Sequence, residues 1–172
     1  MSNNEDMLNN WQLLQNKVIV NFCRTHPYTE LPKKATPEAA CYDVYLPSTQ
    51  SALNPGEIRI VKLGFEVDLP KGYRLELYSR SGIASKGIIV VNSVGIIDSD
   101  FKGEVGIILM NLTNGLYPLN KGDRIGQVAL EKVLDIAWNV VDEIDMSGVE
   151  RNPAGFGSSG GFSEQCGTNT GI

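Results

Sequence analysis

The sequence is short of cysteine, histidine and basic residues, and each shortage excludes a class of function. It contains three cysteines and one histidine among 172 residues, and 15 Lys and Arg against 20 Asp and Glu. The number of cysteines is odd, and Cys23, Cys41 and Cys166 lack the spacing of metal ligands. A disulfide framework or a zinc site is therefore not supported, and a reducing compartment is favoured. The net charge of −5 argues against a broad nucleic-acid surface, although a small anionic ligand needs only a few local arginines.

The sequence also lacks a signal peptide and a membrane-spanning run. Its first residues, MSNNEDMLNNWQLLQ, are polar and acidic, without a basic start or an apolar core. We therefore expect a soluble intracellular protein with no membrane partner, cytoplasmic, or nuclear in a eukaryote or virus. The one histidine, His26, has no Gly-x-Ser-x-Gly elbow to partner it, so a loop position is a better interpretation than a catalytic triad.

Glycine, proline and short β-branched runs are abundant instead. The 18 glycines and 8 prolines favour many turns over long helices, and 172 residues suffice for one domain. The pattern predicts an all-β sandwich or barrel of antiparallel strands, with a body at 17–149, an extension at 1–16 with room for one short helix, and an arm at 150–172. Strands are expected at 17–23, 39–45, 73–79 and 87–92, and also at 57–68, where the strand is either continuous or bent at Gly64. A turn at 116–120 is expected to precede a strand at 121–133, and 136–141 is expected to be a last strand or an irregular segment.

The stretch Val94–Asn111 places a short acidic turn, Asp98 to Gly103, between two apolar runs and predicts a β-hairpin. Asp98 ends the first run, so we expect it beside aliphatic side chains, where desolvation raises the pKa of a carboxyl and makes it a usable base. The alternative, favoured from this stretch alone, is that Asp98 and Asp100 are ordinary turn residues. A calcium loop is excluded, because Lys102 and Leu109 stand where oxygen ligands are needed.

Two further segments contain residues suited to bind an anion or a metal ion. In SRSGIASKG, Ser79 to Gly87, small residues around Arg80 allow backbone N–H groups and a guanidinium to converge on an oxyanion. An equally good interpretation is that Ser81 caps a one-turn helix over 83–86. Asp43 either faces solvent at a sheet edge or is a second acid aimed at a metal ion, and the first is the better interpretation of Asp43 alone.

The composition changes from Glu150 onward. The arm has few large apolar residues, so a disordered free tail is the default interpretation. However, Phe156 stands between glycines, with Arg151 before it and 158–160 after it, which suits a lid over a ligand with an aromatic ring and phosphates. From pattern alone, the function stops at a β domain with a possible anion site.

Five segments together resemble the five motifs of the trimeric dUTP nucleotidohydrolases, or dUTPases, in the family's order. They are AACYDVY, SRSGIASKG, NSVGIIDSDFKGEVG, GDRIGQV and RNPAGFGSSGG, within about residues 17–162. The resemblance implies a jelly-roll-like β-barrel that forms a homotrimer, with active sites between subunits and the arm closing over a neighbouring subunit's site. It implies hydrolysis of dUTP to dUMP and pyrophosphate with Mg²⁺, which keeps uracil out of DNA and supplies dUMP for thymidylate synthesis.

The resemblance also assigns roles to individual residues. Asp98 would orient and deprotonate the attacking water, and Asp43 would hold Mg²⁺ through its water shell. The central hairpin would read uracil through its backbone, with Phe101 beneath the deoxyribose and Phe156 stacked on the base. The residues implied to bind substrate are Arg80, Ser81, Gly82, Asn92, Gly95, Ile96, Ile97, Phe101, Gly106, Gln127, Arg151, Phe156, Gly157, Ser158, Ser159 and Gly160.

Four positions depart from the family pattern, and none removes a group that the reaction requires. Phe101 replaces a usual Tyr, Cys41 a Gly and Ser159 a Thr, and Pro153 interrupts a glycine-rich run. One alternative is a dCTP deaminase of the same fold, which the water-activating Asp98 argues against. The others are a non-catalytic dUTP-binding regulatory module, which should have lost an acid or the arm, and a jelly-roll structural protein, which leaves the charged turns unexplained.

Overall fold

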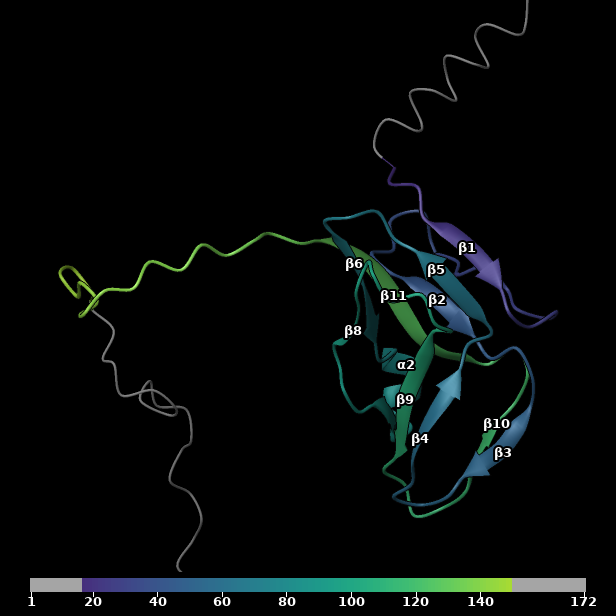
Figure 1. The fold of residues 1–172 in the computed structure, drawn as a ribbon. Coiled ribbons are helices and arrows are strands. Elements are labelled where there is room, and N and C mark those ends of the chain that lie inside the picture. The colour runs from purple at the N-terminus through teal and green to yellow at the C-terminus, as the bar shows by residue number, and fades with distance from the viewer. Residues whose placement is uncertain (1–16, 150–172) are drawn as a thin grey trace, which may run out of the picture. The chain divides into compact units, whose positions relative to one another are not determined.

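The computed structural model describes residues 17–149, whose regular structure is almost entirely β-strand (Figure 1). Among the described residues, 17–135 belong to one compact unit and 136–149 belong to a second. Within residues 17–149, no helix is long and apolar enough to cross a membrane. The elements are β1 (Asn21–Arg24), β2 (Tyr42–Tyr45), β3 (Gln50–Leu53), β4 (Ile58–Lys62), β5 (Phe65–Asp68), β6 (Tyr73–Tyr78), α2 (Ser81–Ala84), β7 (Ile88–Val90), β8 (Gly95–Ile97), β9 (Gly106–Asn111), β10 (Tyr117–Leu119) and β11 (Arg124–Lys132).

The strands pair into four antiparallel sheets, which confirms the prediction of an all-β fold. A four-stranded sheet has the order β2-β11-β6-β8, and a three-stranded sheet has the order β4-β9-β7. The strand pairs β1-β5 and β10-β3 form the other two sheets. The bent alternative for 57–68 is correct, because the chain breaks at Gly64 between β4 and β5.

The core lies between the inward faces of these sheets. Alternate residues of β9 are buried, including Ile107 and Leu109, and Leu75 and Leu77 of β6 are buried beside Val128 of β11. Burial of each such side chain contributes about 1.5–3 kcal/mol, so this alternation positions the strands that carry the site. Gly126 allows β11 to pass close to β9, because a Cβ there would lie 2.3 Å from Ile107 Cδ1.

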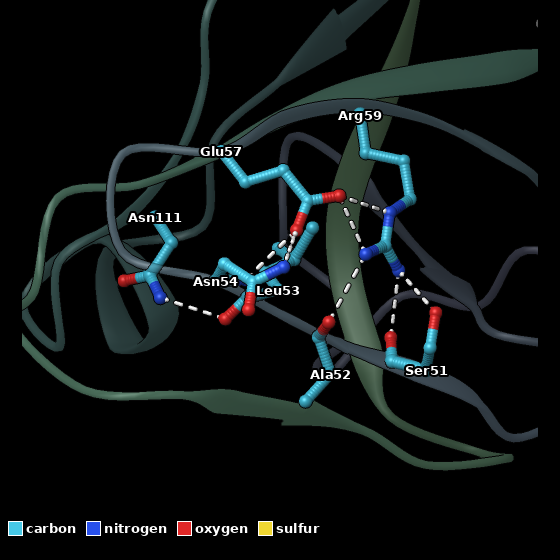
Figure 2. Close-up of polar contacts among 7 residues, drawn as sticks. All are labelled: Ser51, Ala52, Leu53, Asn54, Glu57, Arg59 and Asn111. Atoms are coloured by element: carbon cyan, nitrogen blue, oxygen red, sulfur yellow. Dashed lines mark hydrogen bonds and ion pairs between the residues drawn. The ribbon is translucent and has the colours of Figure 1, made fainter.

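A polar network fixes the turn between β3 and β4 and the end of β9 (Figure 2). The Arg59 guanidinium donates to the carbonyl oxygens of Ser51 at 2.6 Å and Ala52 at 3.0 Å. Glu57 accepts from Arg59 and from the backbone N–H of Asn54, and these hydrogen bonds, the one from Asn54 foremost, lower the pKa of its carboxyl. Arg59 and Glu57 therefore tie the start of β4 to β3, and Asn111 at the end of β9 donates to the Leu53 carbonyl oxygen at 3.0 Å.

The predicted β-hairpin at 94–111 is wrong, although both of its strands exist. β8 pairs with β6, whereas β9 pairs with β4 and β7, so residues 98–105 form a crossover between two sheets. Hairpin loops typically contain about two to five residues, and this connection is longer. Ile97 on β8 and Ile107 on β9 both point into the core, and each strand satisfies its backbone groups on a different sheet.

The structure also decides three smaller expectations. The short helix covers Ser81–Ala84, with Arg80 at its N-cap and no side-chain cap, so Ser81 does not cap a helix over 83–86. Residues 136–141 form no strand, so the irregular alternative is correct there, and Trp138 and Val140 are almost fully exposed. β3 was not predicted, and β10 occupies the segment expected to be a turn. The short helix expected within 1–16 lies outside the described residues.

Candidate active site

The crossover lines a hollow beside Asp98 that also contains apolar side chains of β8. Asp98 follows directly after β8 and lines a cavity of about 190 Å³ with Ile96, Ile97, Phe101, Val105 and Gly106. The expected aliphatic neighbours of Asp98 are therefore present, but the residue itself is exposed in the single chain. The Phe101 N–H donates to the Asp98 carbonyl oxygen at 3.1 Å, which closes the turn.

The crossover is anchored at its far end by charged contacts. Lys102 Nζ donates to the Ser99 carbonyl oxygen at 2.8 Å and pairs with Asp68 Oδ1 at 2.5 Å. Glu104 Oε1 accepts from the Gly64 N–H at 3.0 Å. Hydrogen bonds from Lys102, and then from Asn21, lower the pKa of the exposed Asp68 carboxyl. Sequence reasoning missed this contribution of Lys102, because its partner on β5 is distant in the chain.

A second hollow surrounds Asp43. It has a volume of about 310 Å³ and is lined by Ala35, Ala39, Ala40, Cys41, Asp43, Arg80, Ser81 and Gln127. Arg80 Nε pairs with Asp43 Oδ1 at 2.6 Å, and Arg124 Nη1 pairs with Asp43 Oδ2 at 3.2 Å. Asp43 is 6% exposed, so it does not face solvent at a sheet edge. Arg124 is a site residue that the sequence analysis did not single out, although it stands inside the GDRIGQV motif.

Gln127 and Cys41 complete this second hollow. Gln127 lies between Asp43 on β2 and Tyr78 on β6, and its Nε2 donates to the Ser79 carbonyl oxygen at 3.0 Å. Burial raises the pKa of the Cys41 thiol, and the nearby Asp43 carboxylate raises it further. Space is open around Gly82, since no atom lies within 4 Å of a Cβ placed there. The hollow therefore contains the paired Arg80 guanidinium, with small residues and backbone around it.

A buried carboxylate stands close to this hollow on β6. Glu76 accepts from Arg74 Nε at 2.7 Å and from the Tyr78 hydroxyl in a very short hydrogen bond. The Tyr78 hydroxyl, and then Arg74, lower the pKa of Glu76, and the same hydrogen bond raises the pKa of Tyr78 to about 12. This cluster fixes the strand that leads directly into Ser79 and Arg80.

The side chains around Asp43 fit Mg²⁺ only through a water-mediated contact. Within residues 17–149, no group of three or more His, Cys, Asp or Glu side chains could hold a metal ion. Both oxygens of Asp43 already accept from guanidinium groups. Mg²⁺ retains water and commonly binds through one or two carboxylates plus substrate phosphates. Asp43 therefore fits a water-mediated contact to an ion whose other ligands come from a phosphate chain.

The predicted site residues fall into two groups within the chain. Asp98, Ile96, Ile97, Phe101 and Gly106 share the first hollow, whereas Asp43, Arg80, Ser81 and Gln127 share the second, and no residue lines both. Asn92 lies beside Gly95, since its Nδ2 is 3.2 Å from where a Gly95 Cβ would lie. The predicted arm residues, Arg151, Phe156, Gly157, Ser158, Ser159 and Gly160, lie outside the described residues.

Sequence comparison identifies a matching family model and relatives that share one name. A family model described as dUTPase matches residues 27–160. The deoxyuridine 5'-triphosphate nucleotidohydrolase of Wolbachia pipientis subsp. Culex pipiens is 42% identical over 132 residues, which is 76% of this chain and 86% of the relative. The enzyme of the same name from Desulfotalea psychrophila is 41% identical over 123 residues, 71% of this chain and 77% of its own.

Solved structures show the same fold. A dUTPase mutant of Staphylococcus bacteriophage 80alpha, with dUpNHpp, is 27% identical and has a TM-score of 0.71, covering 84% of this chain and 99% of that chain. A dUTPase mutant of phage phi11 of S. aureus, described for its coordination of a structural Mg(II) ion, has 22% identity and a TM-score of 0.65, covering 74% and 99%. The predicted jelly-roll-like fold is confirmed, and with the matching family model and these relatives we conclude that the chain belongs to the dUTPase family.

Proposed function

We propose that this protein hydrolyses dUTP to dUMP and pyrophosphate. The observation that carries the proposal is the Asp98 hollow, in which a carboxylate stands beside apolar side chains and the backbone of a strand end. The named activity of relatives about 42% identical over most of the chain supports the same reaction. The reaction would keep uracil out of DNA by removing dUTP, and its product dUMP would be available for thymidylate synthesis.

Asp98 acts as the general base in this proposal. Its carboxylate accepts a proton from a water, which attacks the α-phosphorus, and the bond to the bridging oxygen breaks as pyrophosphate leaves. The backbone of Gly95, Ile96, Ile97 and Gly106 pairs with the uracil edge, with Asn92 nearby. Fixed backbone groups oppose cytosine, whose donor and acceptor are exchanged at that edge. Phe101 packs beneath the deoxyribose.

The second hollow receives the phosphates. Arg80, Ser81, Gly82 and Gln127 contact the phosphate oxygens, together with Arg151 and 158–160 of the arm, while Phe156 and Gly157 cover the base. Bound Mg²⁺ supplies neutralising charge to the triphosphate, and Asp43 orients its water shell. Arg80 is already held by Asp43 at 2.6 Å, so the guanidinium is positioned before substrate binds.

The homotrimer that the family resemblance implies is supported by two hollows that share no lining residue. Because Asp98 and Arg80 line different hollows, a complete site forms when one copy supplies the Asp98 hollow and another supplies the Arg80 hollow. The outer face of β4 supports association, since Ile58 and Ile60 are 57% and 63% exposed and pair with Met110 and Ile108 of β9. Such contiguous apolar surface commonly marks a protein interface. The exposed thiol of Cys23 suits a cytoplasmic location.

The test is pyrophosphate release with Mg²⁺ from dUTP, dCTP, dTTP and UTP in parallel. Release from dUTP alone is expected, because only deoxyuridine fits both the backbone readout and the Phe101 contact. Binding of dUTP without release from any substrate would overturn the hydrolase in favour of a regulatory module. Ammonia release from dCTP would identify a deaminase.

A further inference from the structure

Gly103 supports the distal edge of the Phe101 ring. A Cβ added at Gly103 would lie 2.9 Å from Cζ, 3.3 Å from Cε2 and 3.6 Å from Cε1 of Phe101. Carbon atoms in favourable contact are about 3.5–4.0 Å apart, so a Cβ at residue 103 would overlap the ring. The absence of a side chain at Gly103 leaves the space that the Phe101 ring occupies. Phe101 is 44% exposed, so part of the residue faces solvent, toward which the ring can move.

The residues on either side of Gly103 make contacts that hold this part of the crossover. The Lys102 side chain donates to the Ser99 carbonyl oxygen and pairs with Asp68, and the Glu104 side chain accepts from the Gly64 N–H. Val105 is buried, and its N–H donates to the Phe65 carbonyl oxygen at 2.8 Å. An added methyl group at Gly103 is therefore accommodated by rotation of the ring and not by movement of the chain.

The conformation of Gly103 does not itself require glycine. Its φ lies outside the left-handed region, unlike that of Gly64, whose φ is 75°. Glycine in an ordinary conformation costs conformational entropy on folding relative to alanine. The contact with Phe101 is the feature of the structure that an alanine would disturb.

We propose that Gly103 is a specificity-determining position, which selects deoxyribose over ribose by fixing the Phe101 ring. The inference rests on the proposed dUTP hydrolysis, in which Phe101 packs beneath the sugar. Displacement of the ring opens space where a 2′-hydroxyl would lie, so Gly103→Ala should admit UTP. Gly103 acts through Phe101 and makes no contact with the reacting atoms, so it is a positioning residue.

The experiment compares kcat/KM for dUTP and UTP in Gly103→Ala and in a matched control, Gly115→Ala. Gly115 also has an ordinary φ, and no atom lies within 4 Å of a Cβ placed there. We expect the ratio of the dUTP to the UTP value to fall about tenfold in Gly103→Ala and to be unchanged in the control. An unchanged ratio in both variants, with normal thermal unfolding, would overturn the inference.

A double-mutant cycle tests whether Gly103 acts through the ring. In a Phe101→Ala background, Gly103→Ala should change the ratio less than about twofold, because no ring remains to be displaced. The same tenfold change in both backgrounds would overturn the inference. Loss of selectivity is distinct from failure of the proposed function, which would appear as no pyrophosphate release from dUTP by the unmodified protein.

Discussion

The two hollows are built around an aspartate each, but the surroundings of the two carboxylates are opposite. Asp43 is buried and both of its oxygens are paired with guanidinium groups, whereas Asp98 is exposed beside aliphatic side chains and, within residues 17–149, no ion pair holds it. Both oxygens of Asp43 already accept from guanidinium groups, so this carboxylate is engaged as the partner of Arg80 and Arg124. The difference suits Asp98 to act as a base and Asp43 to act as a fixed counter-ion.

Asp98→Asn tests whether Asp98 is the base and is expected to have the largest effect. The amide keeps the shape of the side chain but cannot accept the proton of the attacking water, so turnover of dUTP should fall by about 10³-fold or more. Binding of dUTP, measured by calorimetry, should change little. The matched control is Asp100→Asn in the same turn, which should retain near-normal turnover. Near-normal turnover in Asp98→Asn itself would remove Asp98 from the mechanism.

Removal of residues 151–172 tests whether a third element completes the site. Loss of Arg151, Phe156 and the glycine-serine run should lower turnover by about 10²-fold, because the phosphates and the base lose groups that orient them. The urea midpoint of the body should stay the same, since the core is built from residues before Asp135. An unchanged turnover would mean that the arm does not serve as a lid.

Asp43→Asn probes the other aspartate as a structural counter-ion. Its neutral side chain leaves Arg80, whose side chain is 20% exposed, without a charged partner. Breaking such a buried pair should lower the free energy of unfolding by about 3 kcal/mol and weaken the dependence of turnover on Mg²⁺. Arg124→Met is the control, because the Arg124 side chain is 50% exposed and its loss should cost about 1 kcal/mol or less. Equal losses in the two variants would contradict the distinction.

The sequence predicted most of the strands and singled out Asp98, Asp43 and Arg80, but it did not predict how these residues are arranged. Asp98 at a strand end and Arg80 beside a one-turn helix follow from local signals such as apolar runs, glycine and hydroxyl residues. The pairing of β8 with β6 and of β9 with β4 depends on the whole barrel, so the local pattern around Asp98 suggested a hairpin instead. The Arg124–Asp43 pair joins residues 81 positions apart, and no local pattern indicates such a contact.

The buried Glu76 predicts an acid-dependent loss of stability on the Arg80 side. Its pKa is lowered below the ordinary value of 4.5, first by the Tyr78 hydroxyl and then by Arg74. A lowered pKa in the folded state contributes stability above pH 4.5, and that contribution is lost as the pH falls through the folded value. Between pH 6 and pH 3 the unfolding midpoint should therefore fall less steeply in Glu76→Gln than in the unmodified protein. Glu131→Gln, at an exposed position on β11, should keep the unmodified slope.

The smallest effect is expected at Asp68, the exposed anchor of the Asp98 crossover. The Lys102 and Asp68 side chains are 56% and 58% exposed, and solvent screens such pairs strongly. Lys102 also donates to the Ser99 carbonyl oxygen, so the turn keeps one anchor when the charge is removed. Asp68→Asn should therefore leave turnover within about twofold of normal, with an unfolding midpoint nearly unchanged in a thermal scan. A loss comparable to that of Asp43→Asn would show that this surface pair, and not the backbone of the crossover, positions the catalytic carboxylate.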